Sequence, residues 1–395
     1  MGFLNGSVTF ERFRVTKDPT SAFGDDHIKS LKKHVIDSSG ANLFEAPAYG
    51  FSGGAHLLDT EFELGKNIIG DAMHFGIRCD SVQIPGPIKQ AWMHIELSGA
   101  LKDRPPGSRP TKTQREEAKQ AVEARCAAEA KKGNYKRMSV TPVLWDAMTE
   151  TVFIGSTSEK NNDFCLGLLE SAFGLEFKHV TSGSLAQEFA ETESQTKALF
   201  AASPTSFQPE TPASVVWWNG MGDNYDYLGN EFLLWLWWQT ATSSDTFELS
   251  DGTEVSAMFA RSLSLDCPMG ENGKESISSE SPVALPEANL AIRMGKLPRK
   301  AGLTLVRDGE QFDLTLKAET FSIGSARISQ IGDDVAMRDG IDRIESVRQL
   351  AETADLLYEV FCQARLSKKW SDNLKQMMKW LQSDTPLRKL SKQAA

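Results

Sequence analysis

The chain has 395 residues, of which 40% are hydrophobic and 24% are charged, a mixture typical of a folded protein with two or three domains. Its five cysteines include no CxxC pair, which excludes a zinc ribbon, argues against a disulfide framework and favours a reducing compartment. The net charge of −10 excludes a protein that is basic throughout, so contact with nucleic acid would require a locally positive surface.

The first hundred residues alternate predicted strands and helices. In the strand predicted over 8–15, Phe13 and Val15 fall out of phase with Val8 and Phe10. The residues before that strand and within it include no continuous apolar core of a signal peptide, so we expect a cytoplasmic protein. The further segments, in order, are a helix over 27–36, a strand over 68–78, a break at Pro85-Gly86-Pro87 and a helix over 88–100.

Residues 103–113 are predicted to form a loop, followed by a helix over 114–132 that Ala, Glu, Lys, Gln and Arg dominate. Val122 is its only large aliphatic residue, which makes it a poor core helix and predicts an exposed arm. Residues 101–140 hold eleven Lys and Arg against five Asp and Glu, a net +6 that leaves −16 for the rest of the chain. A charged helix is usually a solvated face, but this opposite charge and Tyr135 beside Lys136-Arg137 favour phosphate contact.

The later segments predict a second α+β region. A hairpin is expected within 143–155 and an amphipathic helix over 163–174, and a proline-rich linker over 201–214 follows. Beyond it, we predict strands over 246–249, 255–265, 302–306, 312–317 and 318–323, a loop over 267–282, a turn at Asp308-Gly309 and a long amphipathic helix over 341–363. Residues 365–395 form a basic tail, which favours either DNA contact or solubility.

Five of the nine tryptophans lie between 215 and 240. Their tight grouping fits a base-stacking platform, an apolar interface or the core, and a helix that is apolar nearly all round favours the core or a domain interface. The longest apolar run, residues 232–238, is far shorter than the roughly 20 residues of a membrane span, so we expect no membrane partner.

No motif in the sequence requires a catalytic centre. The six histidines form no HExxH pattern, and the chain has no P-loop, no GxSxG and no complete dinucleotide fingerprint. We therefore expect no catalytic residue, no metal and no cofactor. There are two alternatives to non-enzymatic DNA binding. One is an enzyme or nuclease accessory that acts on DNA, and the other is a protein-interaction scaffold that uses the Trp-rich surface.

The order of several short motifs resembles the RdgC family of recombination-associated proteins. The clearest match is 82–92, VQIPGPIKQAW, similar to the family's proline-bounded entry into a helix. The resemblance covers residues 1–185 well and residues 285–330 in part. The other matching segments, in order, are Phe3-Leu4, Phe10 to Phe13, Tyr49-Gly50-Phe51, Trp145, Val152-Phe153-Ile154, Leu168-Leu169, Met294-Gly295-Lys296 and Ala301 to Leu305.

This resemblance implies a ring-shaped homodimer that passes duplex DNA through a positively lined hole, binds it without sequence preference and restrains RecA-driven strand exchange. Where the family carries basic and amide residues near a ring contact, this chain has Ser279 and Glu280. By position, the resemblance implies that a set of cations contacts phosphate: Lys89, Lys112, Arg115, Lys119, Arg125, Lys131, Lys132, Lys136 and Arg137.

The sequence as a whole predicts an α+β fold of antiparallel sheets with packed helices and a protruding basic helical arm. Its predicted function is non-enzymatic, sequence-independent binding of double-stranded DNA by a cytoplasmic, nucleoid-associated homodimer. The predicted divisions are an N-terminal α+β region over 1–200 with the arm at 86–140, a linker and Trp-rich segment over 201–245, and a C-terminal α+β region over 246–395.

Overall fold

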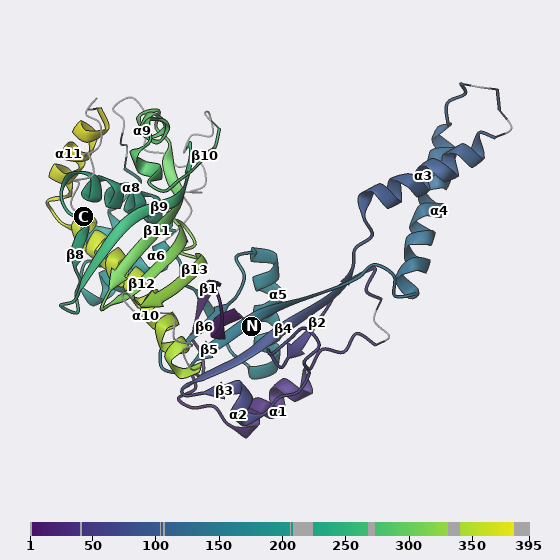
Figure 1. The fold of residues 1–395 in the computed structure, drawn as a ribbon, viewed down its shortest axis with the longest axis horizontal. Helices are drawn as coiled ribbons and strands as arrows, with labels where there is room; N and C mark the ends of the chain where they lie inside the picture. The colour runs from purple at the N-terminus through teal and green to yellow at the C-terminus, as the bar shows by residue number, and fades with distance from the viewer. Residues whose placement is uncertain are drawn as a thin grey trace.

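The computed structural model describes residues 2–39, 42–102, 104–105, 107–205, 207, 224–267, 273–330 and 340–382. Its first half combines short helices with antiparallel strands (Figure 1). In chain order these are η1 (Gly2–Leu4), β1 (Val8–Val15), α1 (Asp25–Lys33), β2 (Ala48–Ser52), α2 (Leu64–Asn67), β3 (Ile68–Ile69), β4 (Ala72–Val82), α3 (Gly86–Ala100), α4 (Lys112–Lys131), β5 (Lys136–Asp146), β6 (Thr151–Ile154), α5 (Glu159–Phe173), β7 (Phe177–His179), α6 (Ser182–Thr192) and α7 (Thr196–Phe200).

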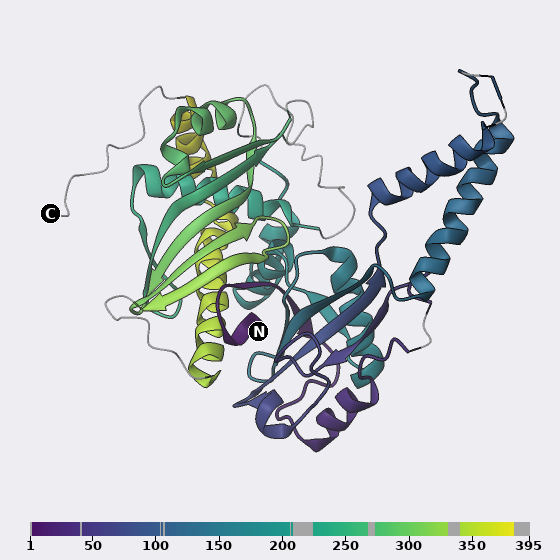
Figure 2. The same cartoon turned by 45° about the vertical axis from the view of Figure 1, so that its right-hand side comes forward.

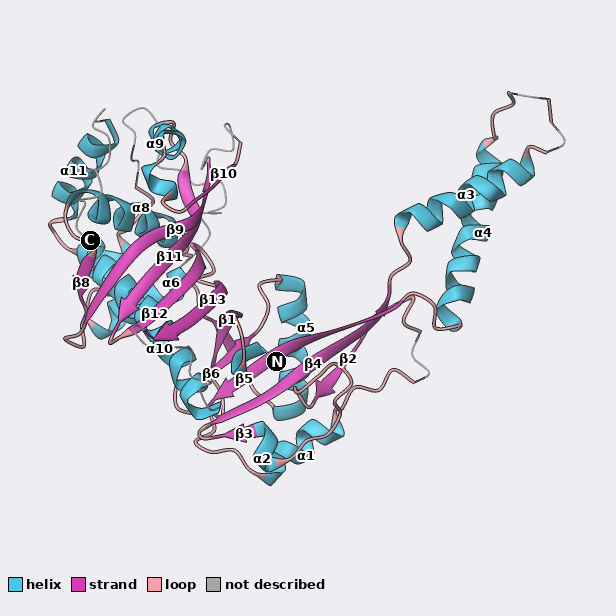
Figure 3. Ribbon diagram, in the orientation of Figure 1, coloured by secondary structure: helices cyan, strands magenta, loops and turns pink. Residues whose placement is uncertain are grey.

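The second half places longer helices against longer strands. Its elements are α8 (Tyr227–Thr242), β8 (Thr246–Glu248), β9 (Glu254–Asp266), β10 (Glu275–Ser279), η2 (Pro282–Ala284), α9 (Pro286–Arg293), β11 (Leu297–Arg307), β12 (Glu310–Lys317), β13 (Ile323–Gln330), α10 (Gly340–Leu366) and α11 (Trp370–Gln382). The predicted α+β class, with antiparallel strands and packed helices, is thereby confirmed (Figure 3).

One sheet connects the two halves. Among the described residues it joins thirteen strands, with the path β10-β9-β11-β12-β13-β1-β6-β5-β4-β2. The connection is β1, whose first residues pair with β13 and whose later residues pair with β6, both antiparallel. A single strand at the N-terminus therefore pairs with one strand about 140 residues away and with another more than 300 residues away in the sequence.

The change of phase inside β1 explains how one strand serves two cores. Val8 and Phe10 belong to the larger core, whereas Phe13 and Val15 belong to the smaller one. Since successive residues of a strand face opposite sides of its sheet, the two cores lie on opposite faces of β1. The out-of-phase apolar residues that look irregular in the sequence are thus the residues that bind the two halves together.

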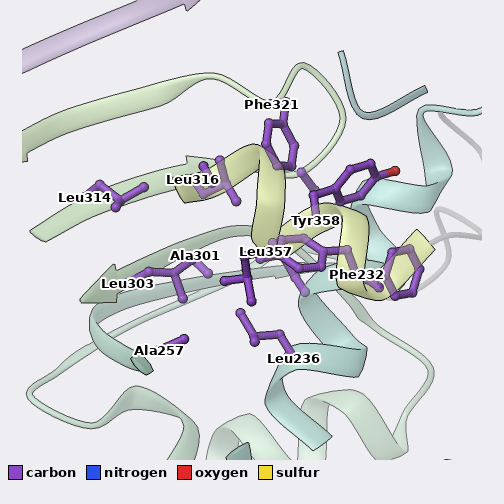
Figure 4. Packing of buried hydrophobic residues seen from close by; sticks show 14 of the residues in the cluster. Phe232, Leu236, Ala257, Ala301, Leu303, Leu314, Leu316, Phe321, Leu357 and Tyr358 are labelled. Atoms are coloured by element: carbon purple, nitrogen blue, oxygen red, sulfur yellow. The ribbon is translucent and has the colours of Figure 1, made fainter. Parts of the chain in front are cut away.

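The larger core is built around α8 and α10, which cover one face of the C-terminal strands (Figure 4). Every residue of α8 from Tyr227 to Trp238 is buried, including Trp235, Trp237 and Trp238. The prediction that the tryptophan-rich segment packs into the core is confirmed for these three, while Trp217 and Trp218 lie outside the described residues. The same core also includes Leu185 of α6 and Leu199 of α7. It therefore draws on residues from both sides of the predicted boundary at residue 200.

Most predicted helices begin and end close to the residues observed, as do the strands β8, β9 and the hairpin of β5 and β6. Gly174 ends α5 with a left-handed φ of 71°, as its position predicted. Three predictions were wrong. The single strand expected over 68–78 is two paired strands, β3 and β4, joined by a turn at Gly70 and Asp71. The expected loop over 267–282 contains β10, and the strand expected over 318–323 is a turn that precedes β13, because Lys317 N–H bonds to Ser322 C=O.

A half-buried histidine, His179, lies where β1 meets β7. The ring of His179 stacks on Phe13 with centroids 4.6 Å apart. Burial and the nearby charges of Lys317 and Arg12 lower its pKa to about 4, outweighing the Glu11 carboxylate 3.5 Å from its Nε2 atom. The folded chain therefore holds this imidazole neutral at neutral pH.

We expect acid to destabilise the protein through His179. Its folded pKa of about 4 lies below the unfolded value, so the unfolded chain takes up the proton first and stability is lost as the pH falls from about 6.5 to about 4. A His179→Phe variant keeps the stacked ring and removes the titration. Urea unfolding at pH 7, 5.5 and 4.5 should show a shallower pH dependence for the variant, and an unchanged dependence would contradict this role.

Candidate nucleic-acid interface

The helices α3 and α4 form a hairpin that projects from the body of the molecule at the far end of β4 and β5 (Figures 1 and 2). The two strands pair along their whole length, from Ala72 opposite Asp146 to Val82 opposite Lys136. Eleven residues of strand extend about 37 Å. Buried residues dominate the end of β5 near the body and exposed ones the end near the helices, so the strands carry the hairpin out of the core.

Local sequence signals define where the helices of this hairpin begin and end. Pro85 precedes α3, and Thr111 opens α4 with a capping box in which Thr111 and Gln114 each bond the other's backbone N–H. The Gln114 amide also donates to the carbonyl of Ala100, joining the start of α4 to the end of α3 at 3.1 Å. Gly133, with a φ of 79°, follows α4 and turns the chain into β5.

The hairpin has a small apolar interior. On α4 the buried residues are Ala118, Val122 and Cys126, which recur every four residues and so form one narrow stripe. Val122 and Cys126 pack in one cluster with Trp92 of α3, and the guanidinium of Arg125 lies 4.7 Å from the centre of that indole ring. The prediction that this helix is poor in core-forming residues is confirmed, and most of its surface is left to solvent.

Ten residues are predicted to contact DNA, namely the nine cations given above and Tyr135. The structure divides them into two groups. Five are exposed and have no carboxylate within ion-pair distance in the part of the chain that the structure describes: Lys89, Lys112, Arg115, Lys119 and Lys131. The other five each engage a protein group and are taken in turn below.

Within the second group, Lys132 pairs with Glu129 at 2.9 Å and Arg137 donates to the Gln83 side chain at 2.5 Å. Arg125 lies over Trp92, as described above. Tyr135, with a φ of 61°, packs against the apolar interior of the hairpin. These four side chains are therefore partly committed to holding the hairpin together.

Lys136 has a clearer structural role. Its Nζ atom lies 3.1 Å from the buried carboxylate of Asp80 and donates to Ser38 at 2.9 Å. Burial opposes ionisation of Asp80, but hydrogen bonds from Arg78, Ser38 and Lys136 outweigh it and hold its pKa below the usual value. Lys136 thus helps to neutralise a buried charge at the base of the hairpin.

Three of the unpaired cations share one side of α4. Lys112, Arg115 and Lys119 are three and four residues apart, which places them on the same side of α4. Lys119 and Lys89 line one groove between the two helices, together with apolar side chains that include Phe44, Met93, Leu97, Val122 and Cys126. Glu123 also lines this groove, so its positive charge is partly offset.

The loop at the tip adds cations that were counted in the charge of the segment but not proposed as contacts. Lys102, Arg104 and Arg109 are exposed, and no ion pair joins them to another described residue. They add exposed positive charge to the connection between α3 and α4. The net positive charge of residues 101–140 was the sequence signal that could have identified these three residues. A search for helical spacing misses them because they lie in a loop.

The basic C-terminal tail is only partly described. Its first residue, Arg365, is buried and pairs with Glu231, while Lys375 pairs with Asp372 on the surface. Exposed Lys368, Lys369 and Lys379 remain, and the basic residues beyond 382 lie outside the described range.

The described residues hold no group of three or more His, Cys, Asp or Glu side chains arranged to bind a metal. The five cysteines are free thiols, four of them buried, and burial raises the pKa of Cys165 to about 12. At neutral pH that thiol is protonated and a poor nucleophile. Within the same residues, every helix is too short or too polar to cross a lipid bilayer.

The helical hairpin therefore presents unpaired cations on a projecting element of an otherwise acidic chain. Searches against protein-family models and curated proteins found no match to this sequence.

Proposed function

We propose that the chain binds double-stranded DNA through the phosphate backbone, without sequence preference, and that the hairpin of α3 and α4 is its main contact element. The observation that carries this proposal is the set of exposed cations on the hairpin that have no carboxylate partner among the described residues. An exposed lysine without a partner is free to displace counterions from phosphates, and such contacts read no base.

The chemistry and position of the hairpin favour this role over a solvated face. Its positive charge stands on a chain that is otherwise −16, and the hairpin projects from the body of the molecule (Figure 2). The α4 helix alone spans about 30 Å, close to one turn of duplex DNA. No side chain in the unpaired group is aromatic, which suits backbone contact better than base stacking.

The resemblance to the RdgC family extends the proposal. It supports a ring-shaped homodimer in which the hairpins contact the DNA, association with the nucleoid of the cytoplasm, and restraint of RecA-dependent recombination. These parts of the proposal rest on the matching sequence segments and on the chemistry of the hairpin.

The experiment is a fluorescence-anisotropy titration of the whole chain against labelled 30-bp duplexes of two unrelated sequences at several salt concentrations. We expect equal affinities for the two sequences and a slope of log K against log salt of about −5 for six phosphate contacts. No binding at low salt, or a preference of more than roughly tenfold for one sequence, would contradict the proposal.

A further inference from the structure

The C-terminal sheet has a polar face opposite its helices. Alternation along the strands sends Leu263, Leu265 and Ala301 into the core beneath α8 and α10. The residues between them, such as Ser262 and Ser264, point to the other face. On that face a groove runs over β9, β10, β11 and β12.

Strand register brings the polar side chains of the groove together. Ser276 of β10 lies opposite Ser264 of β9, Ser264 lies opposite Lys300 of β11, and Lys300 lies opposite Lys317 of β12. With neighbouring strands about 4.8 Å apart, this row spans about 14 Å. Ser278 and Ser262 form a second opposed pair beside it.

The two lysines of the row have no ion-pair partner at close range among the described residues; the charge of Lys317 acts on Glu11 and His179 from farther away, and Glu319 also lines the groove. Lys300 and Lys317 are direct cross-strand neighbours, an arrangement that like charges disfavour. Neither has a carboxylate within 4 Å among the described residues, and the same holds for Lys274 at the mouth of the groove. By contrast, Arg299 in the same groove is paired with Glu319 at 2.6 Å.

The hydroxyls of the groove are also unused. In the described part of the chain, the side chains of Ser262, Ser264, Ser276 and Ser278 make no hydrogen bond to another protein group. Three ammonium groups and four hydroxyls thus face one open groove as donors without protein acceptors. A phosphate group, with its several anionic oxygens, is the ligand that such a donor set fits.

Protection of a sheet edge does not account for these lysines. Charged residues on an exposed edge strand prevent unwanted pairing, and β10 ends the path of the sheet. Lys300 and Lys317, however, belong to β11 and β12, which have paired neighbours on both sides. Edge protection therefore does not explain why these two lysines stand side by side, which favours a role in binding an anion.

We propose that this groove is a second phosphate-binding site, which takes the backbone of the nucleic acid that the hairpin holds. The inference rests on the proposed function and adds a contact surface that is distant in sequence from the hairpin. The side chains of Leu263 and Ile277 belong to the core, and the rest of the lining is polar with no aromatic residue. The groove therefore offers no platform for stacking bases and suits the sugar-phosphate chain.

The test is the Lys300→Gln/Lys317→Gln double variant in the duplex titration, beside a Lys32→Gln/Lys33→Gln variant of exposed lysines on α1. Loss of two phosphate contacts should make the salt slope shallower by about 1.8 and weaken binding at about 0.1 M salt by roughly ten- to hundredfold, while the α1 variant stays like the wild type. Thermal unfolding of each variant is measured alongside, and a midpoint like that of the wild type separates lost binding from unfolding.

The outcomes distinguish this inference from the proposed function. Normal binding by the groove variant, with loss of binding by a hairpin variant, would overturn the groove and leave the hairpin. The reverse would support the groove and overturn the hairpin as the main contact element. Absence of duplex binding by the wild type would overturn both. Lys300- and Lys317-dependent binding of inorganic phosphate without an effect on DNA would overturn the nucleic-acid assignment.

Discussion

Replacing Lys112, Arg115 and Lys119 together with glutamate will weaken binding of random duplex DNA by roughly 10²-fold or more at about 0.1 M salt. Each of these side chains is exposed and without a carboxylate partner among the described residues, so its charge is available to phosphate. Loss of three contacts should also make the salt slope shallower by about 2.7. Anisotropy titrations at several salt concentrations measure both quantities.

These three residues are preferred to Lys136, which lies at the base of the hairpin. Reversing Lys136 would leave the buried carboxylate of Asp80 short of a partner, so lost binding could not be separated from lost stability. A control with the same change in charge is Lys32→Glu/Lys33→Glu/Lys160→Glu, at exposed positions away from the hairpin. Equal binding by the two triple variants would contradict a specific role for the hairpin.

Replacing Arg365 with methionine will lower the free energy of unfolding by about 3–5 kcal/mol. The Glu231 carboxylate is 2% exposed and lies 2.6 Å from the Arg365 guanidinium, in the middle of the apolar α8 helix. Removal of the arginine leaves a buried charge that the backbone N–H of Thr205 alone cannot compensate. Urea unfolding at pH 7, followed by circular dichroism, measures the loss.

Two further variants show whether the loss comes from the unpaired charge. Adding Glu231→Gln to Arg365→Met removes that charge and should restore a large part of the stability. Lys375→Met breaks the exposed pair with Asp372 and should change the free energy of unfolding by no more than about 1 kcal/mol. Equal losses for Arg365→Met and Lys375→Met would refute the buried-pair account.

The helices were predicted from sequence more accurately than the sheet. Helical spacing and capping residues are local signals, so α4, α5 and α10 fall close to the predicted ranges. By contrast, β10 reads ESISS, with one apolar residue and four polar ones, and became a strand because it pairs with β9 at the edge of the sheet. Tertiary pairing outweighs weak strand propensity at such a position.

The positive charge of the candidate site was predictable from the sequence, but the contacts of its residues were not. A count along the sequence finds the positive segment over 101–140, yet it cannot show that Lys136 pairs with Asp80, a residue 56 positions away. The groove of the C-terminal sheet gave no linear signal, because Lys300 and Lys317 are neighbours only through strand register. Similarly, Arg365 looks like part of a basic tail until α8 is seen to bury Glu231.

The most direct test of phosphate contact by the hairpin is lysine footprinting by mass spectrometry. The wild-type chain is acetylated under limiting conditions with and without a random 30-bp duplex at low salt. We predict that DNA protects Lys112 and Lys119 and leaves Lys32, Lys33 and Lys160 as reactive as in the free protein. Equal reactivity of Lys112 and Lys119 with and without bound duplex would contradict the assignment of the hairpin as the DNA-contacting element.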